Sequence, residues 1–130
     1  MNSAVGINLS TIGQIAMPVK DLARAVAFYR DRLGMRFLFQ VPPTLAFFDC
    51  GGVRLMLDVP ADAEFQHPPS VLYYKVADIS AAHSELQQKG VRFIDEPHVI
   101  AKLPTHDLWM TFARDSENNV FALMSEMPSR

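Results

Sequence analysis

The stretch "VKDLARAVAFYRDRLGM", residues 19–35, predicts one amphipathic helix with a defined start and end. Its apolar side chains recur at helical spacing, at Leu22, Val26, Tyr29 and Leu33. Asp21 is suited to cap the first exposed backbone N–H groups, and Gly34 is suited to the left-handed turn that follows the last residue. The segment therefore carries a buried stripe, a start signal and a stop signal.

The same pattern occurs again in "VADISAAHSELQQKGVRF", residues 76–93. The apolar stripe of this second helix comprises Ile79, Ala82 and Leu86. Asp78 corresponds to the capping residue Asp21, and Gly90 corresponds to Gly34 after the helix end, with nearly the same number of residues between the members of each pair. His83 lies between stripe positions and is expected at the surface or half-buried. The chain thus contains one supersecondary unit written twice.

Each predicted helix follows one short β-rich segment and precedes several more. The segments are "IGQIAMPV", "RFLFQV", "LAFFDC" and "VRLMLDV" around the first helix, and "SVLYYKV", "VRFIDE", "LWMTFARD" and "VFALMSE" around the second. The second half is longer, and "EPHVIAKLPTH" is where we place its extra residues. The expected fold is α+β, with two tandem βαβββ modules whose curved mixed sheets surround a cleft. Module one covers about 12–59, a proline-rich linker 60–70 and module two about 71–126, within a single domain 1–130.

Composition narrows the classes of function. The 130 residues are 49% hydrophobic and 20% charged, with a formal net charge of −2, which is typical of one soluble domain and gives no basic surface for nucleic acid or anionic membrane. Cys50 is the chain's single cysteine, so no internal disulfide forms and a cytoplasmic location is expected. The N-terminal residues lack the basic and apolar regions of a secretory signal. A small-molecule ligand is the expected partner.

Strand alternation predicts which side chains line the cleft. They are Gln14, Arg54, Met56, Val71, Tyr73, Lys75, Ala122 and Met124. Their apolar centre and polar or cationic rim favour an aromatic or amphipathic ligand with one anionic group. The aromatic residues Trp109, Phe47, Phe48 and Phe112 are interpreted as strand interior, which more often packs in the core than stacks on a ligand, and contact between one of them and a ligand stays open.

Three phrases carry a resemblance to a known family. "FYRDRLG", residues 28–34, "VADISAAHSELQQKGV", residues 76–91, and "LWMTFARDSENNVFALMSE", residues 108–126, resemble the glyoxalase, bleomycin-resistance and extradiol-dioxygenase superfamily, also called vicinal oxygen chelate proteins. The resemblance covers residues 12–126 and implies paired βαβββ modules and a homodimer. It does not choose a function, because this fold hosts isomerases, lyases, epimerases, dioxygenases, thiol transferases and metal-free antibiotic-binding proteins.

The resemblance also predicts which positions of this sequence would hold a metal ion. Enzymes of the family hold one divalent metal through His and Glu residues on the first and fourth strands of each module. The matching positions here are Gln14, Met56, Val71 and Ala122. None is a histidine or a carboxylate, so no cofactor and no metal are predicted at these positions. The leading hypothesis is a metal-free protein that binds a small amphipathic or aromatic molecule, and no residue is assigned a catalytic role.

Two alternatives stay open. His98 and His106 flank "VIAKLPT", residues 99–105, and a hairpin there could bring them together beside Glu96 and Asp107. Such a set could hold a divalent metal for a glyoxalase-like lyase, an isomerase or a dioxygenase, whereas a solvated hairpin tip would place the same polar residues together without function. The other alternative is an accessory domain whose cleft receives a partner protein.

Overall fold

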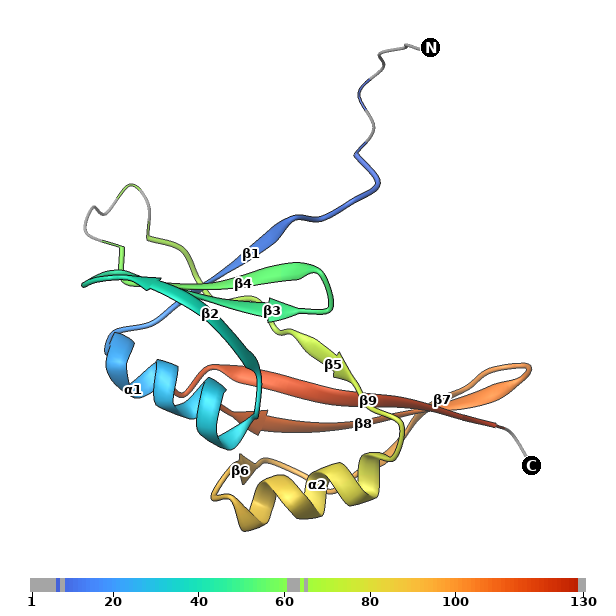
Figure 1. Ribbon diagram of the computed structural model, residues 1–130. Helices are drawn as coiled ribbons and strands as arrows, with labels where there is room; N and C mark the ends of the chain where they lie inside the picture. Colours follow the sequence, from blue (N-terminus) through green and yellow to red (C-terminus); the bar gives the residue numbers. More distant parts are fainter. Residues whose placement is uncertain (1–6, 8, 61–63, 65, 129–130) are drawn as a thin grey trace.

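The first half of the chain folds as a four-stranded sheet with one helix. The computed structural model describes residues 7, 9–60, 64 and 66–128 (Figure 1). The elements of this half are β1 (Gln14–Pro18), α1 (Leu22–Ala27), the π-helical segment η1 (Phe28–Arg32), β2 (Arg36–Val41), β3 (Leu45–Cys50) and β4 (Val53–Asp58). The strand order is β1-β4-β3-β2, with β1 parallel to β4 and the other pairs antiparallel.

The second half repeats this plan with one additional strand. Its elements are β5 (Tyr73–Lys75), α2 (Ile79–Gln88), β6 (Arg92–Phe93), β7 (His98–Lys102), β8 (His106–Arg114) and β9 (Val120–Pro128). The strand order is β5-β9-β8-β6, and β7 pairs with β8 in a hairpin that projects to the right in Figure 1. The predicted α+β class with two mixed sheets is confirmed. Of the predicted linker 60–70, residues 61–63 and 65 lie outside the described residues.

The predicted helix signals act as expected at both sites. Asp21 accepts a hydrogen bond from the Arg24 N–H, and Asp78 accepts one from the Ala81 N–H. Gly34 and Gly90 have φ of 68° and 89°, a conformation that favours glycine. The first helix also widens into η1, so its last N–H groups bond five or six residues back, which helical periodicity alone does not predict.

The core lies between the helices and one face of each sheet. Its fully buried side chains include Met17, Tyr29, Phe48, Leu55, Leu57 and Phe121. His83 is also buried, because it is only 6% exposed and the centroid of its ring lies 4.2 Å from that of the Phe93 ring. The expectation of a surface or half-buried His83 is therefore wrong. The short strand β6 covers this side of α2, which the stripe of the helix alone does not indicate.

The turn between β8 and β9 connects the second half to the first helix. The Tyr29 hydroxyl donates a 2.7 Å hydrogen bond to Asp115, whose other carboxylate oxygen accepts the Glu117 and Asn119 N–H groups. Burial, with the adjacent Asp115 charge, raises the pKa of Tyr29 far above its usual value. The Asn119 amide donates to the Pro18 carbonyl at 3.1 Å. A turn of the second half thus contacts the end of β1, just before the first helix, and the η1 segment that continues this helix.

Glu117 accepts several hydrogen bonds at the connection that leads into α1. Its carboxylate accepts the Lys20 and Asp21 N–H groups at 2.6 and 3.0 Å, and it forms an ion pair with Arg24. Burial opposes ionisation, yet these hydrogen bonds and the Arg24 charge prevail and lower the pKa of Glu117. This contact closes the helix end with a residue nearly one hundred positions later in the chain.

Within the described part of the chain, no helix has the length and apolar character needed to cross a bilayer.

Candidate functional site

The predicted cleft residues lie on the sheet faces opposite the core. In the first sheet Gln14 pairs with Arg54 and Ala16 with Met56, and the Gln14 side-chain amide lies 3.6 Å from the Met56 sulfur. In the second sheet Tyr73 pairs with Ala122 and Lys75 with Met124. Directly opposed residues share a face. Each sheet therefore gathers its own predicted residues on one surface, which we call the open face.

These residues differ in how much surface they present. Tyr73 and Val71 are 46% and 43% exposed, although Val71 precedes the start of β5. Gln14, Arg54 and Lys75 are exposed, and Met56 and Met124 are half-buried. Ala122 is fully buried and offers a ligand no surface. Lys75 is held by Glu126 at 2.7 Å, and this ion pair lowers the pKa of Glu126. The accessible centre of the open face is thus smaller than the sequence suggests.

Three phenylalanines extend the open face beyond the predicted set. Phe47 lies opposite Met56, its ring stacks on Phe39 at a centroid distance of 4.5 Å, and the Arg54 guanidinium lies 5.3 Å from its centroid. In the second sheet Phe112 makes an edge contact with Tyr73 at 5.9 Å. We call the group formed by Phe39, Phe47 and Arg54 the aromatic stack. Phe39 is its accessible end, being 44% exposed.

The interpretation of Phe47 and Phe112 as core is incomplete. Phe48 is core, since it is fully buried between Tyr29 and Phe37. Phe47 is adjacent to it on the same strand and must point to the opposite side of the sheet. The signal that could have placed Phe47 on the open face was strand alternation, which the sequence reasoning applied to Met56 but not to Phe47.

A small cavity joins residues of the two halves at the edge of the open face. Its volume is about 180 Å³, and it is lined by Ile15, Cys50, Val53, Arg54, Leu55, Leu72, Tyr73 and Tyr74. Arg54 and Tyr73 are the two predicted cleft residues in this lining. Burial raises the pKa of both the Cys50 thiol and the Tyr74 hydroxyl. Neither group is therefore disposed to ionise near neutral pH, and the Arg54 guanidinium supplies the charge at this cavity.

The donor chemistry of the open face does not fit a divalent metal. Gln14 and Met56 contact each other and present an amide and a thioether, while Val71 and Ala122 have no donor atoms in their side chains. Catalytic metals of this class require several imidazole or carboxylate ligands. Across residues 7, 9–60, 64 and 66–128, no group of three or more His, Cys, Asp or Glu side chains is arranged to hold a metal ion.

The two histidines proposed as an alternative metal site, His98 and His106, lie apart on the β7–β8 hairpin. The hairpin forms, but His98 pairs with Met110 whereas His106 pairs with Pro128 at the other end. Four residues of extended strand, ~13 Å, lie between the position of His98 and the hairpin tip. His98 contacts the Glu96 carbonyl at 2.8 Å, and His106 lies 3.0 Å from the Glu126 carboxylate. The alternative in which the two histidines face each other is not realised, because His98 lies opposite Met110, four residues along β8 from His106.

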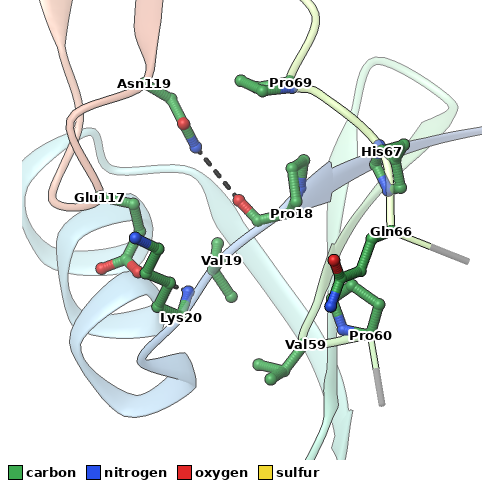
Figure 2. A pocket seen from close by; sticks show the side chains of 10 residues that line it. All are labelled: Pro18, Val19, Lys20, Val59, Pro60, Gln66, His67, Pro69, Glu117 and Asn119. Atoms are coloured by element: carbon green, nitrogen blue, oxygen red, sulfur yellow. Dashed lines mark hydrogen bonds between the residues drawn. The ribbon is translucent and has the colours of Figure 1, made fainter. Parts of the chain in front are cut away.

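A larger cavity opens beside the start of α1. Its volume is about 480 Å³, and Figure 2 shows its walls, which are Pro18, Val19, Lys20, Val59, Pro60, Gln66, His67, Pro69, Glu117 and Asn119. The Asn119 and Glu117 side chains that point into this region are engaged with backbone atoms of the β1–α1 connection. The His67 ring lies 3.5 Å from the Asp58 carboxylate. The polar groups here serve the fold, so we do not assign this cavity a ligand.

Comparison with known proteins assigns the family. The chain matches the family model of the Glyoxalase/Bleomycin resistance protein/Dioxygenase superfamily over residues 11–123. The chain belongs to this superfamily. The resemblance inferred from the sequence phrases is therefore confirmed. No curated protein sequence matches the chain significantly.

Solved structures of the superfamily share the fold. A lactoylglutathione lyase from Agrobacterium tumefaciens aligns with a TM-score of 0.71 at 24% identity, over 91% of this chain and 95% of that chain. A superfamily member from Sphaerobacter thermophilus aligns with a TM-score of 0.76 at 20% identity, over 91% and 98%. A glyoxalase/bleomycin resistance protein/dioxygenase from Nocardioides aligns at 0.69 and 23% identity, over 95% and 87%. Identities at this level establish the fold of this superfamily member and nothing finer.

Proposed function

We propose that this superfamily member binds a small aromatic molecule that carries an anionic group, on its open face and without a metal ion. The aromatic stack is the observation that carries this proposal. An exposed phenylalanine ring backed by a second ring provides an apolar platform, and the guanidinium above the second ring provides the charge. Tyr73, exposed beside Arg54 at the small cavity, adds a hydroxyl that can donate or accept a hydrogen bond.

The geometry favours this class over neutral or cationic ligands. Lys75 is occupied by Glu126. Asp49 lies directly opposite Arg54 in the strand register, but its carboxylate accepts the Gly52 N–H, and within the described residues Arg54 forms no ion pair. Its remaining donors are therefore available to a carboxylate or sulfonate, which guanidinium binds in a bidentate manner. The nearest apolar surface for the rest of the ligand is the exposed ring of Phe39. An amphipathic molecule satisfies both demands.

Binding of 1-naphthoate, an aromatic carboxylate, tests the proposal. We expect isothermal titration calorimetry to show saturable binding, and Arg54→Gln to weaken it about tenfold because a charge-assisted hydrogen bond is lost. Phe39→Ala should weaken it several-fold by removing the platform. Arg30→Gln removes the same charge from an exposed ion pair on η1 and serves as the matched control. Equal affinity in all four proteins, or no binding to any, would contradict the proposal.

A further inference from the structure

A third cavity lies between the first helix, with η1, and the strands β6 and β8 of the second half. Its volume is about 470 Å³, and its walls are Arg24, Ala27, Phe28, Asp31, Arg32, Gly90, Arg92, Arg114, Asp115 and Ser116. Four of these residues are arginines, in a protein whose formal net charge is −2. We call this the arginine cavity. Such a concentration of guanidinium groups in one concave site requires an explanation.

Of the four arginines that line this cavity, one forms an ion pair with a carboxylate of the described chain. Arg24 forms its ion pair with Glu117 at 2.6 Å. Arg32 donates to the Gly90 carbonyl and Arg114 to the Asn118 carbonyl, both at 3.2 Å, so each contacts a neutral partner. For Arg32, Arg92 and Arg114, no carboxylate of the described chain lies within ion-pair distance. Three cations of the cavity therefore keep their charge uncompensated by a direct partner.

Two of these cations are placed directly opposite each other. Arg92 in β6 pairs with Arg114 in β8, in antiparallel register. Directly opposed side chains lie close together on one face of a sheet, and like charges at such positions destabilise the pairing. β6 consists of two residues, so the repulsion falls on one of the shortest strand pairings in the fold. A bound anion between the two guanidinium groups would convert this repulsion into attraction.

The remaining polar groups of the cavity fit an oxyanion. The Ser116 hydroxyl is buried and has no hydrogen-bond partner among the residues that the structure describes, which leaves one further donor for a ligand oxygen. Asp31 is held by Arg30. The Asp115 carboxylate already accepts three donors, from Tyr29, Glu117 and Asn119. Three free cations against this one carboxylate leave a local excess of two positive charges.

From this arrangement we propose that the arginine cavity binds a phosphate-bearing small molecule. A phosphate dianion matches the local excess of charge, and its tetrahedral oxygens can accept from several guanidinium forks at once. Arg32, Arg92 and Arg114 would bind the anion through their guanidinium groups, and the Ser116 hydroxyl would donate one further hydrogen bond to it. The positive φ of Gly90 favours glycine at this wall of the cavity, and a Cβ atom there would lie 2.9 Å from the Arg32 guanidinium nitrogen, so Arg32 would have to shift. This site is independent of the open face and of the function proposed for it.

Thermal unfolding in sodium phosphate and in sodium pyrophosphate tests the site, with sodium chloride at equal ionic strength as the reference. We expect the two phosphates to raise the Tm of the wild-type protein saturably above the chloride value, because they bind the folded state. Arg92→Gln and Arg114→Gln should abolish most of this rise. In chloride alone, the same substitutions should leave Tm unchanged or raise it, since each removes the opposed charge.

The control is Arg36→Gln, an exposed residue on β2 that does not line the cavity, and it should keep the full response to phosphate. A wild-type Tm that follows ionic strength alone would overturn the proposal, as would an undiminished phosphate response in both Arg92→Gln and Arg114→Gln. An equal and saturable rise in sodium succinate, lost in the same variants, would overturn the assignment to phosphate in favour of a dicarboxylate.

Discussion

Asp115→Ala is expected to lower the free energy of unfolding by about 3–5 kcal/mol, because the carboxylate accepts several charge-assisted hydrogen bonds in a buried setting. The residue is 1% exposed. Its loss removes the acceptors of the Glu117 and Asn119 N–H groups and leaves the Tyr29 hydroxyl buried without a partner. Urea denaturation followed by circular dichroism measures the change. The effect is large because one residue holds both the β8–β9 turn and the helix of the other half.

Two further variants identify the source of this loss. Asp115→Asn keeps an oxygen that can accept a backbone N–H and should cost less than the alanine variant. Asp31→Ala removes an exposed carboxylate from an ion pair with Arg30 and should change stability little. A loss under about 1 kcal/mol for Asp115→Ala would show that the turn does not fix the first helix as described.

Phe48→Ala is expected to cost about 3–5 kcal/mol, the usual result of removing a fully buried aromatic ring. Phe48 is 0% exposed, and its ring contacts Tyr29 and Phe37 at centroid distances of 6.0 and 5.5 Å. The cavity left behind would lie under the helices, where the sheet and η1 meet. The same denaturation experiment measures this loss.

Phe39→Ala provides the matched comparison on the opposite face. Phe39 is 44% exposed and stacks on Phe47 rather than packing beneath the helices. Its removal should cost about 1 kcal/mol, the value of one aromatic contact with partial burial. Equal losses for the two phenylalanines would mean that Phe39 on β2 is buried as deeply as Phe48 on β3, and this part of the open face would then be core.

Much of the fold follows from local signals in the sequence. Asp21, Asp78, Gly34 and Gly90 mark the helix ends correctly, because capping and left-handed turns depend on nearby residues alone. Strand alternation correctly groups Gln14 with Arg54 and Met56 on one face. Both kinds of signal act within one element or between neighbouring strands.

Features that depend on contacts between distant residues could not be predicted from the sequence. The sequence does not indicate that Glu117 accepts the Lys20 and Asp21 N–H groups before the first helix, or that Tyr29 donates to Asp115, because these contacts arise when the halves meet. The segment "VRFIDE" forms only a two-residue strand, since the Asp95 carboxylate accepts the Phe112 N–H and the Thr111 hydroxyl and ends the pairing. The arginine cavity likewise combines residues from η1, β6 and β8, so no single segment reveals it.

The candidate site was predicted in part for the same reason. Alternation selects the residues of the open face, but it cannot tell that Glu126 holds Lys75 or that Ala122 is covered. The hypothesis of a site at His98 and His106 needed the register of the β7–β8 hairpin. That register separates them.

On the open face of this superfamily member, Gln14, Met56, Val71 and Ala122 do not supply the imidazole or carboxylate ligands that a catalytic metal requires. The most direct test is the metal content per chain, measured by elemental analysis after incubation with zinc, nickel, iron or manganese salts and removal of free metal. We predict that none of the four is retained near stoichiometry. Retention of about one equivalent of any of them, lost on changing Gln14 to alanine, would show that the open face binds a metal.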